Sequence, residues 1–207
     1  IARAAGANEI NGDRMWHYVE GIHNWDPIWP KHAIRIIPGP SSMWFDATGR
    51  RLPGPLWPGF DTLGTLDHIQ RTGHDHTWFV LTQKIIEKEF ALSGSEQNPD
   101  TTSKSWRAVL KERLGSGPPT PVQRFMDHGD DFIVERDFGR MVERMNALAG
   151  ADLIDPAALR EQIVARDREI DNRFAKDGQV TAIHGARNYW ADKVSRVTAP
   201  HNTLDPS

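Results

Sequence analysis

The sequence predicts an α+β protein, with a small sheet and aromatic-rich loops in its first half and a cluster of helices in its second half. Three observations support this class. Short apolar runs bounded by turn residues, typical of strands, all fall before residue 82. Cap residues followed by proline, with glycine at the far end, mark helices in the second half. Six of the eight tryptophans lie within the first 78 residues.

The first half alternates expected strands with short helices. Residues 1–6 read as the end of a helix that stops at Gly6, and Asn11-Gly12 signals a tight turn within a strand pair, or a strand and turn, over residues 9–18. Further strands are expected over residues 34–37, 43–45 and 77–81, and helices over 62–72 and 83–90. The strand over 77–81 is apolar throughout, which predicts a central, buried position.

Residues 38–67 are expected to organise the fold. The apolar run Met43-Trp44-Phe45 leads into the turn 46–49, where Gly49 suits a positive φ and Asp46 can hydrogen-bond the turn backbone. The segment that follows is crowded with proline, glycine and aromatic residues. We expect it to form a rigid loop that holds Trp57 and Phe60 in place, before a helix begins at residue 61 or 62.

The second half is predicted to be helical. The expected helices cover residues 103 or 105 to 114, 120–129, 137–148 and 155 to about 176. The last and longest has an apolar face made of Leu159, Ile163, Ile170 and Phe174. Arg166 and Asp167 interrupt that face, so we expect it to be only half covered there. The charged clusters over 135–144 and 160–173 are interpreted as solvated helix faces.

Composition excludes several classes of function. A net charge of -3 over 207 residues gives no reason to expect nucleic acid or an anionic membrane as partner. No apolar run approaches the ~20 residues of a membrane-spanning helix. The absence of cysteine excludes disulfides and thiolate metal sites, and it fits a cytoplasmic location. Because the chain opens with Ile1 and stops at Ser207 without a closing element, we expect it to be an internal piece of a longer protein.

Metal and phosphate sites are not predicted. His74-Asp75-His76, with His68 before it, places imidazoles near one another but lacks a complete ligand set at zinc spacing, so no metal site is expected. The sequence has no G-x-G-x-x-G, no Walker lysine and no G-x-S-x-G, so nothing in it indicates that this chain alone binds a dinucleotide. Ser41-Ser42 is interpreted as a turn and not as a nucleophile.

Two features allow both a functional and a structural interpretation. Trp16-His17-Tyr18 puts an imidazole beside a phenol, which can donate to a substrate carbonyl or relay a proton, or can sit in a strand with both side chains satisfied by the backbone. The aromatic loops likewise belong to the core, or form one wall of a flat apolar pocket completed by another domain. The side chains concerned are Trp25, Trp29, Trp57 and Phe60.

The order of these segments resembles the flavoprotein family of fumarate reductases and 3-ketosteroid Δ1-dehydrogenases. Residues 43–52 resemble the strand, turn and GxRF segment of its capping domain, and Trp16-His17-Tyr18 resembles the segment with the substrate-binding histidine. The strings RMWHYVEGIHNW, FDTLGTLDHI and WFVLTQKIIEKEFALSGSEQNPD are similar to an actinobacterial subgroup of FAD-binding dehydrogenases.

The resemblance implies that residues 1–12 end a flavin-domain segment, that 13–200 form a capping, substrate-binding domain, and that 201–207 begin the return to the flavin domain. FAD would be bound by that other domain of the same polypeptide, with no cofactor-binding residue in this chain. The substrate would be an apolar, 3-ketosteroid-like molecule oxidised by hydride transfer to the flavin. His17 and Tyr18 would be catalytic, and the isolated chain would be inactive. The substrate-binding residues would be Trp44, Trp57, Phe60 and His68.

The sequence departs from the family pattern at two places. Residues 64–67 carry no arginine where fumarate reductases have one, and Pro58-Gly59-Phe60 stands where ketosteroid dehydrogenases have Pro-Tyr. Neither activity is therefore transferred with its catalytic residues. The alternative interpretation is a self-standing protein-interaction module that docks a partner through its aromatic surface. An uncovered aromatic patch would also favour self-association.

Overall fold

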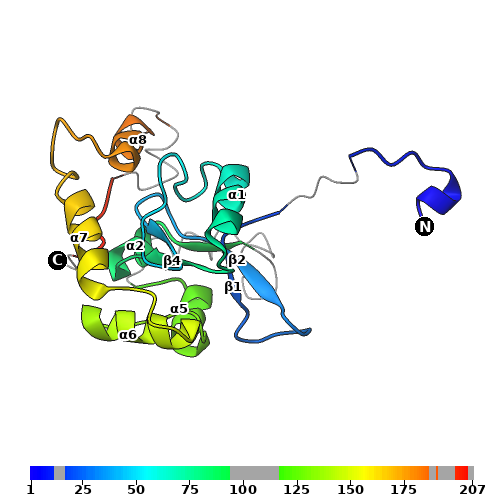
Figure 1. Cartoon of the computed structure of the whole chain (residues 1–207), viewed down its shortest axis with the longest axis horizontal. Helices are drawn as coiled ribbons and strands as arrows, with labels where there is room; N and C mark the ends of the chain where they lie inside the picture. Colours follow the sequence, from blue (N-terminus) through cyan, green and yellow to red (C-terminus); the bar gives the residue numbers. More distant parts are fainter. Residues whose placement is uncertain (12–16, 94–116, 187–189, 191–198, 205–207) are drawn as a thin grey trace.

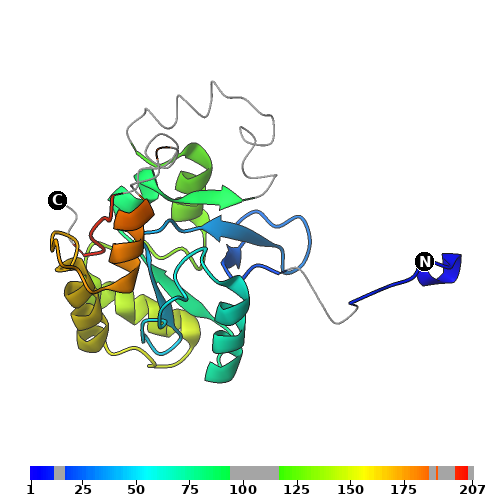
Figure 2. The same cartoon turned by 90° about the horizontal axis from the view of Figure 1, so that it is seen from above.

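The computed structural model describes residues 1–11, 17–93, 117–186, 190 and 199–204. Helices mix with two small antiparallel sheets, so the predicted α+β class is confirmed (Figure 1). Residues 1–11 are exposed throughout, include a 3₁₀ turn, η1 (Arg3–Ala5), that ends at Gly6 as predicted, and extend away from the rest of the chain (Figures 1 and 2). The expected helix near residues 103–114 and the turn at Asn11-Gly12 lie wholly or partly outside the described residues.

Among the described residues, five short strands form two sheets. β1 (Gly21–His23), β2 (Ala33–Ile37) and β5 (Ala91–Ser93) pair in the order β1-β2-β5, with Ile22 opposite Ile34 and Ile36 opposite Leu92. β3 (Met43–Asp46) pairs with β4 (Thr77–Val80). The strands predicted over 34–37 and 43–45 are therefore confirmed as β2 and β3.

The expectation that residues 77–81 form a central strand is wrong. Within the described part of the chain, β4 pairs with β3 alone. Three of its four residues are only half-buried, and Trp78 packs on one buried cluster and Phe79 on two others, one of which includes side chains of the other sheet. An apolar run indicates burial on both faces but does not say what covers them.

Most predicted helix ends within the described residues are confirmed, but the helix over residues 178–186 was not predicted. They are α1 (Thr62–Thr72), α2 (Gln83–Lys88), α5 (Thr120–His128), α6 (Phe138–Ala149), α7 (Pro156–Asp167) and α8 (Gly178–Ala186). Asp61, Asp137 and Asp155 cap α1, α6 and α7, each carboxylate accepting a 2.8 Å hydrogen bond from the backbone N–H three residues ahead. The N-cap of α5 is Pro119, one residue earlier than predicted.

The single helix predicted over residues 155–176 is wrong. α7 ends at Asp167, and α8 begins only at Gly178. The Asp167 carboxylate accepts hydrogen bonds from the backbone N–H groups of Thr203 and Leu204, at 2.8 and 3.1 Å, so this end of α7 is tied to a distant segment. Phe174, predicted on the apolar face, is 83% exposed as a result.

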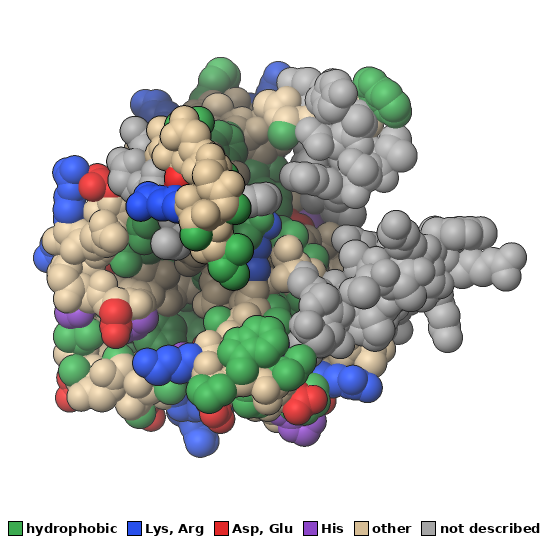
Figure 3. Space-filling model, turned by 90° about the vertical axis from the view of Figure 1, so that its right-hand side faces the viewer, with side chains coloured by type: hydrophobic (Ala, Val, Ile, Leu, Met, Phe, Trp, Pro, Cys, Tyr) green, Lys and Arg blue, Asp and Glu red, His purple; other side chains and the backbone are tan. Residues whose placement is uncertain are grey.

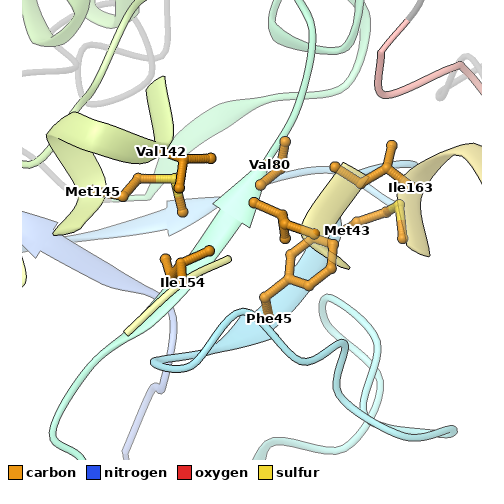
Figure 4. Close-up of a cluster of buried hydrophobic side chains, with 8 residues drawn as sticks. Met43, Phe45, Val80, Val142, Met145, Ile154 and Ile163 are labelled. Carbon is orange, nitrogen blue, oxygen red and sulfur yellow. The ribbon is translucent and has the colours of Figure 1, made fainter. Parts of the chain in front are cut away.

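Three apolar clusters make up the core. In the first, Met43, Phe45 and Val80 of the two-stranded sheet meet side chains of α6, α7 and the connection between these helices (Figure 4). A second cluster lies between the three-stranded sheet, α2 and α5, and includes Ile86 and Phe90, both buried as predicted. Ile85 is also buried, as predicted. The third, which we call the loop cluster, consists of Trp44, Leu52, Leu56, Val19, Ile69 and Phe79.

Part of the stretch expected to organise the fold is well buried: residues 38–49, which we call the central segment, are buried except for the half-buried Pro40 and Thr48. The Asp46 Oδ1 atom accepts hydrogen bonds from the Thr48 and Arg50 N–H groups, at 2.8 and 3.0 Å, and closes the predicted turn. Gly49 has φ 77°, and a Cβ atom there would lie 2.8 Å from a methyl of Ile154. Only glycine fits both the backbone and the space at this position.

Candidate functional site

The loop cluster joins the segments that carry all six predicted site residues. Val19 follows His17 and Tyr18, Leu56 precedes Trp57, Ile69 follows His68, and Trp44 is itself a member. Phe60 is connected through Trp57, whose ring centroid lies 5.1 Å from that of Phe60 in an edge-on arrangement. The structure therefore brings four separate stretches of sequence to one place beside α1.

Trp44 lies inside this cluster and not on its surface. Its side chain is 2% exposed and stacks on Phe79 with ring centroids 4.5 Å apart. The indole Nε1–H donates a 2.9 Å hydrogen bond to Thr77 Oγ1, so its single polar group is satisfied internally. In this conformation the Trp44 ring is part of the buried cluster and cannot contact a ligand.

The aromatic loop, residues 53–60, presents two rings with different surroundings. Trp57 is half-buried, and its ring packs so closely that a Cβ atom at Gly54 or Gly178 would lie 3.0 or 2.7 Å from it. Phe60 is 63% exposed. The loop therefore anchors one ring against the start of α8 and offers the other to the outside.

His17 and Tyr18 lie at the entry to β1. His17 is half-buried, and Tyr18 is 48% exposed. The Arg35 guanidinium of β2 lies over the Tyr18 ring, 3.8 Å from its centroid, in a cation–π contact that sequence reasoning missed. The contact holds the Tyr18 ring beside the end of β1, where its hydroxyl can donate to or accept from a polar group of a ligand.

His68 is half-buried in the middle of α1. Figure 3 views the side that bears β1, β2 and α1 and shows hydrophobic side chains between charged ones. The exposed fractions of Trp29, Phe60 and Leu63 are 53%, 63% and 66%. Two surface hollows of 510 and 330 Å³, over α6 and beside α8, include none of the six predicted residues.

Glu20, which sequence reasoning did not single out, links the two halves of this site. Its side chain is 3% exposed, and its Oε1 atom accepts a 3.2 Å hydrogen bond from the backbone N–H of Gly59, in the aromatic loop. Its own backbone carbonyl accepts from the Ile36 N–H at 3.1 Å, which fixes it beside β2. A single acidic residue between Val19 and Gly21 carries no sequence pattern that would have marked it.

A buried polar network lies on the opposite side of the central segment. Arg166, expected on a half-covered face, is 1% exposed, and its Nη1 donates to the carbonyl of His201 at 2.6 Å and to Asp167 Oδ1 at 3.0 Å. Burial lowers the pKa of Arg166, against the opposing effect of Asp167. The interpretation of residues 160–173 as a solvated face is therefore wrong at Arg166. Its neighbours Leu159 and Ile163 are buried as predicted, so the guanidinium extends the buried face of α7.

Arg51 extends this network toward α8. It forms a bidentate ion pair with Asp177 and donates to Gln179 Oε1 at 2.7 Å. Gln179 in turn donates to the carbonyls of Pro40 and Ser42, at 2.6 and 2.8 Å. Burial raises the pKa of Asp177, but the hydrogen bonds from Arg51 and from the Val180 N–H outweigh this effect. The pKa of Asp177 therefore lies below its ordinary value.

Ser41 has a structural environment, in agreement with its interpretation as part of a turn. Its N–H donates to Glu89 Oε2 at 2.7 Å, and its Oγ accepts from the His201 backbone N–H at 3.0 Å. The His201 ring meets the other Glu89 oxygen at 2.5 Å through Nδ1. The imidazole thus faces Glu89 and not the serine hydroxyl, so these three residues do not form a nucleophilic triad.

No group of three or more metal-ligating side chains occurs among the residues that the structure describes. The His74 and His76 rings lie 6.3 Å apart, and His76 Nδ1 meets Asp75 Oδ1 at 3.1 Å. That hydrogen bond lowers the pKa of Asp75. Over the same described residues, no helix is long and apolar enough to cross a membrane.

Comparison with known proteins identifies the family. A family profile described as "FAD binding domain" matches residues 1–203. This chain belongs to the FAD binding domain family. A KsdD-like steroid dehydrogenase of Mycolicibacterium smegmatis is 58% identical over 206 residues, which is 100% of this chain and 38% of that protein. Its counterparts in two Mycobacterium tuberculosis strains are 57% identical, and the chain covers 36% of each. No solved structure matches this chain.

The family assignment confirms the resemblance to FAD-dependent dehydrogenases drawn from the sequence. The chain spans less than two fifths of the length of the curated relatives that it matches. One expectation is not supported. Because the family profile covers residues 1–203, flavin binding cannot be assigned wholly to other parts of the polypeptide on the ground that this chain has no glycine-rich motif.

Proposed function

We propose that this chain forms the substrate-binding part of an FAD-dependent dehydrogenase that oxidises an apolar ring ketone of the 3-ketosteroid type. The observation that carries this proposal is the 57–58% identity, along the whole chain, to proteins named steroid dehydrogenases. Sequence identity at this level supports a shared reaction class. The convergence of aromatic and polar side chains around the loop cluster supports a site for a flat, apolar molecule.

The proposed site has an apolar wall and a polar end. Trp57 and Phe60 form the wall, and Trp44 is buried in the loop cluster with Leu56 of the same loop. Tyr18 and His17 supply donors for a ketone oxygen or an acceptor for the proton that is lost, and the Arg35 guanidinium contacts the face of the Tyr18 ring. His68 of α1 contributes a further polar contact at the edge of the wall. Closure of this surface by the rest of the polypeptide would exclude water.

The residues described here do not fit the pyrophosphate of FAD. Every strand pair among them is antiparallel, and the chain has no strand followed by a G-x-G-x-x-G turn and a helix, the arrangement that binds a dinucleotide phosphate. We therefore propose a divided flavin site, in which the pyrophosphate lies against the rest of the polypeptide and this chain, matched by the family profile over residues 1–203, contributes other contacts. When bound, the flavin supplies the hydride acceptor. Any contact from this chain to the flavin would come from the edge of the proposed site.

The proposed domain organisation follows from this division. Residues 1–12 would belong to a flavin-domain segment, which is supported by the exposure of residues 1–11 and by the position of these eleven away from the rest of the chain (Figure 1). Residues 13–200 would form the capping domain, and the return to the flavin domain would begin within 201–207. Because His201 and Thr203 are buried against α7, the return would leave the capping domain only after Leu204.

The test is the visible absorption spectrum of the product of the whole gene. We expect a flavin band, and we expect a 3-ketosteroid to bleach that band in the absence of oxygen or another acceptor. A protein that stays colourless after addition of FAD would overturn the proposal and favour an interaction module. A flavin band that no ring ketone bleaches would retain the flavoprotein assignment and overturn the substrate class.

A further inference from the structure

The tether between Glu20 and Gly59 joins the segment of Tyr18 to the aromatic loop. Glu20 Oε1 accepts the Gly59 N–H at 3.2 Å, from a side chain that is 3% exposed. The residues before Glu20 carry the proposed polar end of the site, and the residues around Gly59 carry its apolar wall. The spacing between the two parts therefore depends on this contact.

Gly59 is the third residue of a turn that spans residues 57–60 and is closed by a backbone hydrogen bond. It is exposed, has φ 75°, and a Cβ atom built on it would meet nothing within 4 Å. Trp57 is fixed on its far side by close packing against Gly178, and the Phe60 N–H donates back to the Trp57 carbonyl at 3.0 Å. The turn fixes the backbone within the loop. The Glu20 carboxylate adds a hydrogen bond from that turn to the segment of Tyr18.

The other carboxylate oxygen of Glu20 indicates that filling space is not the reason for an acidic residue at this position. Glu20 Oε2 is buried and has no hydrogen-bond partner among the residues that the structure describes. Buried polar atoms without partners are uncommon in native proteins and call for a specific reason. An apolar side chain of similar size would fill this space without desolvating a carboxylate. What the acid adds is the hydrogen bond to Gly59.

We infer that Glu20 is a positioning residue that sets the aromatic loop, and with it Phe60 and Trp57, at the distance from Tyr18 that the ligand requires. This inference rests on the proposed function for the identity of the ligand. The tether itself is a property of the fold and can be measured without turnover. Glu20 acts through the loop and need not touch the ligand.

The experiment compares Glu20→Met, which keeps the volume but removes the acceptor, with Glu20→Gln, which keeps an acceptor oxygen. Hydrogen exchange of the Gly59 amide is followed by mass spectrometry in the product of the whole gene. We expect exchange about tenfold faster in Glu20→Met and close to the parent rate in Glu20→Gln. Gln162→Met is the matched control. Gln162 Oε1 accepts a 2.9 Å hydrogen bond from the backbone N–H of Arg51, which precedes the aromatic loop that contains Gly59. This variant should leave Gly59 unchanged.

Steady-state kinetics with a 3-ketosteroid then test the consequence for the site. Glu20→Met should raise KM about tenfold with kcat changed by less than about twofold, and Glu20→Gln should restore KM. Unchanged Gly59 exchange in Glu20→Met overturns the inference whatever the activity. Faster exchange with an unaltered KM also overturns it, because the tether would then be structural only. If the protein turns over no ring ketone, the proposed function fails while the exchange result still decides whether the tether exists.

Discussion

Arg166 Nη2 donates to the carbonyl oxygen of Ser41 at 3.1 Å and so joins α7 to the central segment across 125 residues of sequence. The same guanidinium donates to the carbonyl of His201. One side chain therefore connects the helical half, the central segment and the last described residues. Removal of its charge would leave two buried carbonyl groups without a donor.

The first prediction concerns this connection. Arg166→Met keeps most of the side-chain volume but removes the donors, and it should lower the free energy of unfolding by about 3 kcal/mol. Urea denaturation followed by circular dichroism measures the effect. Arg160→Met is the control, because Arg160 is exposed on the same helix and should change stability by less than about 0.5 kcal/mol. Equal effects from the two variants would contradict a central role for Arg166.

The second prediction is a pH dependence at Asp177. Its pKa in the folded protein is below the unfolded value, so its ionised form stabilises the fold above the unfolded pKa, and this contribution is lost as pH falls through the folded pKa. Asp177→Asn should therefore lower stability by about 1–2 kcal/mol at pH 7. The difference from the parent should shrink below about pH 4.

Urea denaturation at pH 7 and at pH 3 measures this dependence. Asp171→Asn, at an exposed position, is the control and should show little effect at either pH. A destabilisation by Asp177→Asn that is the same at both pH values would mean that the charge of Asp177 contributes nothing. The ion pair with Arg51 would then act as an ordinary hydrogen bond.

Local signals in the sequence predicted most helix ends and the strands β2, β3 and β4, but they missed the short strands β1 and β5 and the helix α8. Long-range polar contacts could not be predicted from them. Asp61, Asp137 and Gly150 end their helices as expected, because caps and αL glycines act within one helical turn. The end of α7 at Asp167 was missed, because its partners Thr203 and Leu204 lie more than 35 residues away. An aspartate on an apolar helix face looks solvated until the segment that covers it is known.

The candidate site was likewise predicted only in part from the sequence. Its aromatic members were found from composition and from resemblance to a family, and the structure places their segments around one cluster. Trp44 was expected to line a pocket, but its partner Thr77 holds it inside, and this pairing depends on strand register. Arg35 and Glu20 were missed because each is an isolated charge whose meaning comes from its neighbour across a strand or a loop.

The third prediction separates backbone strain from crowding at the central turn. Gly49 and Gly150 both have positive φ, at 77° and 71°, but only Gly49 has a neighbour, Ile154, within 4 Å of an added Cβ. Gly150→Ala should cost about 1 kcal/mol through the backbone alone, and Gly49→Ala about 2–4 kcal/mol because overpacking adds to that strain. Thermal denaturation of the two variants provides the comparison. Equal losses would show that Ile154 moves aside without cost.

The fourth prediction tests the apolar wall without disturbing the fold. Phe60 is 63% exposed, so Phe60→Ala should change the free energy of unfolding by less than about 0.5 kcal/mol. If the ring contacts an apolar ligand in the whole protein, its removal should raise KM for a 3-ketosteroid about tenfold or more, because a buried aromatic contact contributes a few kcal/mol to binding. The measurement is steady-state turnover with the flavin content verified by absorbance.

Phe174→Ala is the matched control for this wall. Phe174 is 83% exposed and lies between α7 and α8, outside the loop cluster, so the same truncation should leave KM within about twofold of the parent. Because both variants lose the same ring from the surface, a difference between them isolates the position of Phe60. If both raise KM equally, the effect comes from general surface hydrophobicity. If neither does, the ligand binds away from the aromatic loop, and the proposed position of the wall is wrong.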